Sequence, residues 1–273
     1  MRRQWAAAVV AVAGAVSIAV APAAQALPVV DMEKVLLAAQ IDPRRPDSAL
    51  TPGARDHVLV VEQALQAKGL LAAQYVDGHF GTSTTTAYTN LQKSFGWSGI
   101  DTNGIPGQTS LERLGEGRFT VTNVVSAGAR VSHQGKTINT RTKAMLAAAE
   151  ARLGRTLTIT QGSYNPGGVG ASGGTHDGGG ALDISVSGMS DTVKVDVVRK
   201  LREVGFAAWW RKPSQGQWDH HIHAMAVSDP HQSVSAWHQS GDYYLGLNGL
   251  ANRAPDDGPA VTKRTWEEVQ RGE

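Results

Sequence analysis

Histidine and aspartate residues gather in two short segments of this 273-residue chain. The first segment, Thr175–Asp183, contains His176 and Asp183, and the second, Trp218–His223, contains His220, His221 and His223. In an extended strand, side chains two residues apart share a face, so His221 and His223 should lie on the same side. One of these imidazoles can bind a metal ion while the other stands a few Å away. Two His and one Asp, with a fourth position open to water, are typical of a catalytic zinc site.

The position of Asp183 supports this interpretation. Its neighbours Leu182 and Ile184 are apolar, so the carboxylate faces opposite to them and into the interface between the sheet and the loops. A buried carboxylate is costly unless it meets a cation or strong hydrogen-bond donors. The chain contains no cysteine, so a metal ion here must use His, Asp, Glu and water. A structural His/Asp network without a metal remains the alternative.

The elements expected around these residues predict an α+β domain with an antiparallel sheet. A Gly-rich loop, 161–180, carries His176, and a strand over 181–186 carries Asp183. The remaining expected elements are helices over 142–153 and 193–204 and strands near 157–159, 206–210 and 222–226.

The first half of the chain predicts a small all-α module of three helices. Helices are expected from Asp56 to Gly69, from 84 to 95 and from 109 to 114. Two similar loops separate them, Asp77-Gly78-His79-Phe80-Gly81 and Asn103-Gly104-Ile105-Pro106-Gly107. Glycine suits such turns because it adopts positive φ without steric cost.

This arrangement resembles the peptidoglycan-binding module of many bacterial wall hydrolases. The matching pieces are Val61-x3-Leu65-x3-Gly69, Asp77-Gly78-x-Phe80-Gly81-x2-Thr84-x2-Ala87-x3-Leu91-Gln92 and Gly104-x2-Gly107-x-Thr109-x4-Leu114. The resemblance implies a wall-anchoring role, with peptidoglycan as the partner.

The second half, from about Val131 to Ala226, resembles the zinc D,D-peptidases and murein endopeptidases of the bacterial wall, which share their fold with the hedgehog signalling domain. The motif Gly174-x-His176-x3-Gly180-Ala181-Leu182-Asp183, followed by His221-x-His223, carries this resemblance. It implies Zn²⁺ held in a cleft by His176, Asp183 and His223. It also implies that His221 assists the zinc-bound water.

The sequence departs from that family at two places. Many members have a Glu three residues before the last ligand, where this chain has His220, so the proton carrier is expected to be His221 or Asp219. Asp219 is further expected to accept a ring N–H from His221, and His220 to stabilise an oxyanion. Many members also have an arginine after a Ser-x-Tyr turn that binds the substrate carboxylate, whereas Ser163-Tyr164-Asn165 has none. This second difference favours an endopeptidase, or another peptide-cleaving enzyme, over a strict carboxypeptidase.

The N-terminus has the pattern of an export signal. Arg2 and Arg3 precede an apolar run from Ala6 to about Ala21, and Ala24-Gln25-Ala26 is a cleavage signature before Leu27. Without residues 1–26 the chain has 24 basic and 24 acidic residues, which argues against nucleic-acid binding. We therefore expect a secreted, wall-associated monomer that does not bind membranes once the signal is removed.

The expected organisation is a signal peptide at 1–26, a linker at 27–55, a peptidoglycan-binding module at 56–118, a zinc peptidase-like domain at 119–227 and a C-terminal extension at 228–273 that packs on the catalytic domain. The expected function is zinc-dependent hydrolysis of peptide bonds in peptidoglycan stem peptides or cross-links. A non-catalytic wall-binding protein with a structural or degenerate metal site is the alternative.

Overall fold

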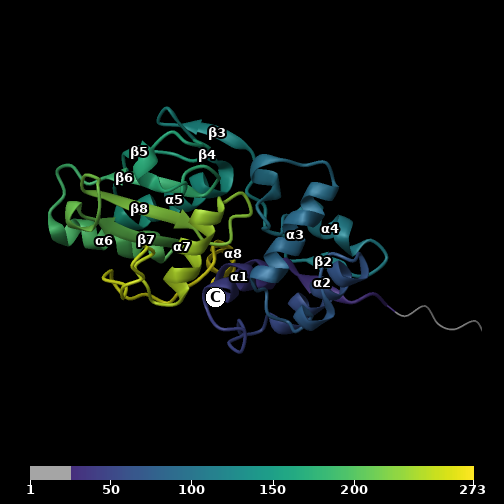
Figure 1. The fold of residues 1–273 in the computed structure, drawn as a ribbon. Coiled ribbons are helices and arrows are strands. Elements are labelled where there is room, and N and C mark those ends of the chain that lie inside the picture. Colours follow the sequence, from purple (N-terminus) through teal and green to yellow (C-terminus); the bar gives the residue numbers. More distant parts are fainter. Residues whose placement is uncertain (1–25) are drawn as a thin grey trace, which may run out of the picture.

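The computed structural model describes residues 26–273, and its architecture is α+β (Figure 1). The expected signal peptide lies outside these residues, except for Ala26. Among the helices of residues 26–273, none combines the length and apolar character that a bilayer crossing requires.

The first part of the chain is mainly helical. A short strand β1 (Val29–Asp31) pairs in parallel with β2 (Thr120–Thr122), and the four helices between them are α1 (Met32–Ile41), α2 (Arg55–Ala67), α3 (Thr82–Ser94) and α4 (Gln108–Gly115). The expected helices α2, α3 and α4 are therefore present. Gly69 lies just beyond α2 with φ of 72°, the left-handed conformation that ends a helix.

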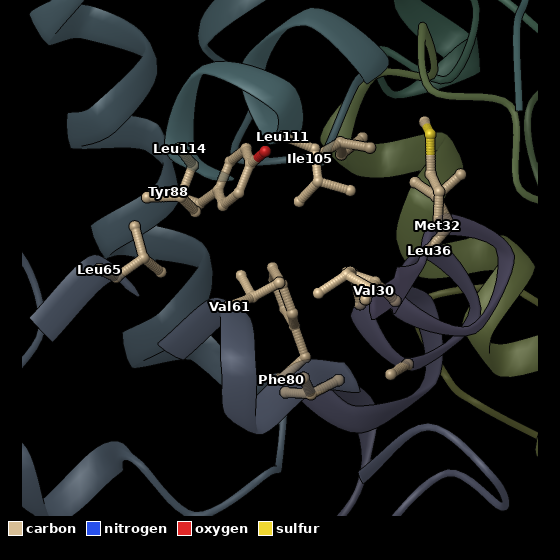
Figure 2. Close-up of a cluster of buried hydrophobic side chains, with 14 of the residues drawn as sticks. Val30, Met32, Leu36, Val61, Leu65, Phe80, Tyr88, Ile105, Leu111 and Leu114 are labelled. Atoms are coloured by element: carbon tan, nitrogen blue, oxygen red, sulfur yellow. The ribbon is translucent and has the colours of Figure 1, made fainter. Parts of the chain in front are cut away.

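The stretch 27–55, expected to be a linker, is instead part of the core. Val30, Met32, Val35 and Leu36 are completely buried and pack with side chains from α2, α3 and α4 (Figure 2). Burying an apolar side chain of this size contributes about 1.5–3 kcal/mol. The linker prediction was wrong because α1 completes the helical core that the other three helices leave open.

Two buried side chains on neighbouring helices hold the two similar loops. Glu62 of α2 accepts the backbone N–H groups of Asp77 and Gly78 at 3.0 and 2.8 Å. Gln92 of α3 accepts the N–H of Gly104 at 2.9 Å and donates to the carbonyl of Ile105 at 2.8 Å. The two similar loops expected from the sequence are therefore held in the same way, each by hydrogen bonds to a buried side chain of a preceding helix.

The second part is built on a four-stranded antiparallel sheet with the strand order β5-β6-β8-β7. A hairpin of β3 (Arg130–His133) and β4 (Lys136–Asn139) precedes it. The sheet and the helices around it are β5 (Ile159–Gln161), β6 (Ala181–Ser185), β7 (Phe206–Arg211), β8 (His221–Ala226), α5 (Thr140–Leu153), α6 (Asp191–Arg202), α7 (Val234–Tyr244) and α8 (Trp266–Arg271).

The two faces of this sheet pack against different helices. Leu182, Ile184 and Ile222 face α5 and α6 and form one core with them. On the other face, Trp209 and Met225 pack against Ala236 and Tyr243 of α7. The C-terminal extension thus covers part of the sheet face that carries Asp183 and His223.

Helix α7 also joins the two parts of the chain. The indole of Trp237 lies in the helical core and donates its N–H to the carbonyl of Ala39 in α1 at 2.9 Å. Arg44 pairs with Asp242 at 2.9 Å. Because α1 and α7 are packed together, the expected layout of two separate domains is not confirmed.

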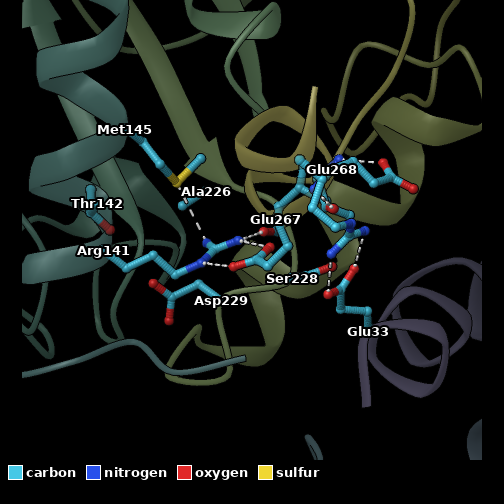
Figure 3. A network of polar contacts seen from close by, with 12 residues as sticks. Glu33, Arg141, Thr142, Met145, Ala226, Ser228, Asp229, Glu267 and Glu268 are labelled. Carbon is cyan, nitrogen blue, oxygen red and sulfur yellow. Dashed lines mark hydrogen bonds and ion pairs between the residues drawn. The ribbon is translucent and has the colours of Figure 1, made fainter. Parts of the chain in front are cut away.

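Ion pairs connect the final helix, α8, to the helical first part and to the sheet-based second part of the chain. Arg141 of α5 pairs with Glu267 of α8 at 2.7 Å, and Glu33 of α1 pairs with Arg271 at the end of α8 at 2.8 Å. Figure 3 shows Arg141 beside Glu267, with Glu33 approaching from its own helix. Helix α8, near the C-terminus, is therefore tied by ion pairs to α5 and to α1, the first helix of the described residues.

Candidate metal centre

The sheet register brings the expected ligands together. Asp183 of β6 lies directly opposite His223 of β8, and Trp209 of β7 lies on the other side of His223. The Nδ1 atom of His223 is 2.7 Å from Oδ1 of Asp183. The alternation expected from the sequence therefore places the carboxylate and imidazole on one face.

The Gly-rich loop between β5 and β6 supplies the third member of the group. His176 is fully buried, and its Nε2 lies 3.3 Å from Oδ1 of Asp183. The loop packs closely against residues 231–233 because Gly178 has no side chain; a Cβ there would collide with the main chain of His231–Ser233. His176, Asp183 and His223 each offer a ligand atom, and these atoms lie within 4.8 Å of one another.

A hydrogen bond fixes the tautomer of the His176 imidazole. Nδ1 of His176 is 2.7 Å from the carbonyl oxygen of Gly162, which can only accept, so Nδ1 carries the hydrogen and Nε2 presents a lone pair. Both ring nitrogens of His223 face an oxygen: Nδ1 is 2.7 Å from Oδ1 of Asp183, and Nε2 is 2.9 Å from Oε1 of Gln239. Donation from Nε2 to Gln239 is the arrangement that would leave Nδ1 free to bind a cation. Gln239 comes from α7, outside the expected catalytic domain.

The two imidazoles meet at the Asp183 carboxylate. Burial lowers the pKa of His223 to about 4 although the nearby Asp183 carboxylate opposes this shift, so the ring is neutral at pH 7. Burial alone raises the pKa of Asp183, but His176 and His223 together outweigh burial and hold it well below its usual value. Nε2 of His176 is buried and has no hydrogen-bond partner among the described residues. Two imidazoles and a carboxylate fit a cation, which would take the place of the hydrogens between the rings and Asp183.

His221 lies beside this group, as expected. Its Nε2 is 3.7 Å from Oδ1 of Asp183, and its side chain is 19% exposed. Its Nδ1 donates to an oxygen of Asp219 at 2.7 Å, but that oxygen belongs to the main-chain carbonyl. The Asp219 carboxylate, expected to orient the ring, is on an exposed residue and forms no part of the cavity wall.

His220 lies elsewhere. Its Nδ1 accepts the indole N–H of Trp210 at 3.2 Å, and Trp210 packs on the sheet face covered by α5 and α6. This is the opposite face from Asp183 because residues 220 and 221 point to opposite sides of the chain. The geometry gives no support to the oxyanion role expected for His220.

A small cavity of about 90 Å³ opens beside the metal group. Asp183, His221 and His223 line one side, and the Gly-rich loop contributes Val169, Ala171, Ser172 and Thr175. Other wall residues are Gln161, Arg211, Trp218, Gln239 and Leu250. Sequence reasoning missed Arg211, Gln239 and Leu250, which only the tertiary fold brings to this place.

Comparisons of the chain with protein-family models, with curated protein sequences and with solved structures found no match.

Proposed function

We propose that this protein is a zinc-dependent peptidase that binds the bacterial cell wall and hydrolyses peptide bonds in peptidoglycan stem peptides or cross-links. The observation that carries the proposal is the convergence of His176 Nε2, Asp183 Oδ1 and His223 Nδ1 beside an open cavity. Two imidazoles and one carboxylate suit zinc among the common protein-bound metals. The repeated loops held by Glu62 and Gln92 support the wall-binding part through their resemblance to peptidoglycan-binding modules.

The metal and the protein have separate tasks in this proposal. When bound, zinc polarises a peptide carbonyl and supplies a nucleophile near neutral pH. His176, Asp183 and His223 would hold the ion, with Gly162 accepting the Nδ1 hydrogen of His176 and Gln239 placed to accept the Nε2 hydrogen of His223.

His221 is the proton carrier in this mechanism. The carbonyl of Asp219 holds the hydrogen on Nδ1, so Nε2 faces the group with a free lone pair. Nε2 can accept a proton as the nucleophile attacks and donate it to the leaving amine. Apart from the ligands, the titratable side chains on the cavity wall are those of His221 and Arg211. Arginine stays protonated at neutral pH, which leaves His221 for this role.

The test is incubation of the purified full-length protein with whole peptidoglycan, with and without a chelator. Mass analysis of the released fragments should show peptide products that the chelator abolishes and added zinc restores. His176→Ala should lose the metal and the products together. His133→Ala, in the β3–β4 hairpin, is the matched histidine control and should keep both.

Two results would count against the proposal. Binding to sedimented peptidoglycan without any released peptide, in protein that contains a full equivalent of zinc, would favour the non-catalytic wall-binding alternative. Full zinc occupancy in His176→Ala would reject the ligand assignment.

A further inference from the structure

The helical first part and the sheet-based second part of the chain lie side by side (Figure 1), and a cavity of about 380 Å³ lies where they meet. We call it the junction cavity, and its volume is within the range of small-molecule sites. One wall comes from residues 97–110, and the others come from residues 125–127 and from Pro230 and His231 in the turn after β8. None of its described wall residues belongs to the cavity beside the metal group.

Hydrogen bonds between these segments fix the shape of the junction cavity. Asn103 donates its side-chain amide to the main-chain carbonyl of Gln232 at 3.0 Å, which ties residues 97–110 to the turn after β8. The main-chain carbonyl of Ala127 accepts the N–H of Arg141, at the start of α5, at 3.2 Å. The walls are therefore in place before a ligand arrives, as in most small-molecule sites.

Trp97 gives the junction cavity a flat apolar surface. The indole is half-buried and lines the wall. It packs edge-on against Phe95 with ring centroids 5.2 Å apart, and Cζ of Arg113 lies 3.7 Å from the centroid of Phe95 and 5.9 Å from that of Trp97. These contacts hold the indole in one position, so it loses little freedom on binding. A sugar ring presents C–H groups on one face, and such a face packs well against the negative face of an aromatic ring.

The hydrogen-bonding groups of the wall favour a neutral ligand with hydroxyl or amide groups. Neutral side chains of this kind are those of Gln108, Thr109 and Ser126. The titratable wall residues are Asp101, which can accept hydrogen bonds from hydroxyls, and His231. No lysine or arginine of the described residues lines the cavity, so the wall offers no partner for a phosphate or carboxylate. A cationic ligand is disfavoured as well, because the guanidinium of Arg113 lies beside Trp97.

A network from the sheet-based part orients His231. Oδ1 of Asn139 accepts the N–H of Thr142 at 2.7 Å, so its Nδ2 donates to the hydroxyl of Tyr164 at 3.2 Å and to Asp229 at 2.7 Å. Burial raises the pKa of Tyr164 to about 12, so the hydroxyl keeps its hydrogen at neutral pH. The acceptor placed for that hydrogen is Nδ1 of His231 at 2.9 Å, which puts the ring hydrogen on Nε2. His231 therefore brings an oriented donor to the wall of the junction cavity.

We propose that the junction cavity binds a neutral N-acetylated sugar of the peptidoglycan glycan strand. The choice of this glycan rests on the proposed wall-binding function, which the inference deepens by naming the ligand and its place. The indole of Trp97 packs against the C–H face of the sugar ring, while Asp101 and His231 bind its hydroxyl and amide groups. Because His231 lies outside the expected module at 56–118, glycan binding depends on both parts of the chain.

The experiment is calorimetric titration of the purified full-length protein with chitotetraose, the β-linked tetramer of N-acetylglucosamine. We expect binding that a chelator leaves unchanged, because the junction cavity is separate from the metal group. Trp97→Ala should weaken binding roughly 10-fold, and Trp97→Phe, which keeps an aromatic ring, should weaken it less. His231→Ala should weaken it roughly 2- to 10-fold, the range for one hydrogen bond. His133→Ala, in the β3–β4 hairpin, is the matched histidine control and should bind like the wild type.

Several results would overturn the inference. These are no binding of the tetramer by the wild type, wild-type affinity in a folded Trp97→Ala variant, and loss of binding with the chelator. Tighter binding of the cationic glucosamine tetramer than of the N-acetylated one would reject a neutral sugar as the ligand. If Trp97→Ala does not fold, wild-type affinity in both Trp97→Phe and His231→Ala has the same consequence as wild-type affinity in Trp97→Ala.

The two proposals can fail separately. Chelator-sensitive release of peptides from peptidoglycan by a protein that does not bind the tetramer would refute the saccharide site and leave the peptidase function intact. Trp97-dependent binding of the tetramer without any peptide release would do the reverse.

Discussion

Gln239 of α7 should control how tightly the metal binds. Its Oε1 lies 2.9 Å from Nε2 of His223, so in the zinc-bound protein it would accept the hydrogen on Nε2 and leave Nδ1 free to bind the ion. In Gln239→Ala the ring of His223 loses this restraint and can place its hydrogen on Nδ1, towards Asp183. That tautomer cannot bind the ion through Nδ1.

The size of the effect follows from this single bond. Loss of a group that orients a metal-binding imidazole typically costs 10–100-fold in affinity, which corresponds to about 1.4–2.7 kcal/mol. Gln239→Glu keeps an acceptor at the same place and adds negative charge, so it should bind zinc at least as tightly as the wild type. The difference between Ala and Glu therefore measures the acceptor and not the packing of α7.

The assay is competition for zinc between the protein and a fluorescent chelator, which needs no enzymatic turnover. Thermal unfolding of both variants without metal provides the control for folding. Zinc affinity of Gln239→Ala within twofold of the wild-type value would refute the reasoning. So would equal losses in the Ala and Glu variants.

Three further predictions address other residues. His221→Ala should retain zinc and lose roughly 10²–10⁴-fold in turnover, the usual contribution of a general acid–base residue. Asp219→Asn should leave turnover unchanged because the main-chain carbonyl of Asp219 makes the contact with His221. A larger loss of released peptides in Asp219→Asn than in His221→Ala would reverse this assignment. Burial raises the pKa of Glu62 from its usual 4.5 to about 7, so the native chain holds a proton that the unfolded chain releases, and the free energy of unfolding should fall by about 3 kcal/mol as pH rises from below 4.5 to above 7. Denaturant titrations should show this fall in the wild type but not in Glu62→Gln, and an equal slope in both would contradict it. A fragment of residues 56–118 lacks β1 and α1 and should show no cooperative thermal unfolding by circular dichroism; a sharp transition would mean that α1 is dispensable.

The metal group could be predicted because its geometry is largely local. His221 and His223 share a face through strand alternation, and Asp183 lies between two apolar residues that point into the core. Period-two patterns of this kind are determined by backbone geometry and survive in any sheet. The pairing of Asp183 with His223, in contrast, depends on the strand order and register, which cannot be read from the residues near either position.

The elements that the sequence analysis missed have weak local signals. Helix α1 packs against both the helical core and α7, so its apolar residues do not form one stripe. Helix α7 contains Ser235, Ser240 and Gly241, which are poor helix formers, and its stability comes from packing. Gln239 and Arg211 reach the cavity only through these tertiary contacts, and neither belongs to a motif.

The closure of the chain by α1, α7 and α8 has a consequence for its synthesis. The metal ligands lie between residues 176 and 223, but Gln239 and the segment that covers Arg211 at Gly249 come later. A nascent chain therefore has every ligand before it has the groups that orient His223 and fix Arg211. Metal captured at that stage would bind more weakly, and the substrate cavity would lack its far wall. Under the proposed function, full activity should consequently appear only after the residues beyond His223 have been made and have packed against the residues made first.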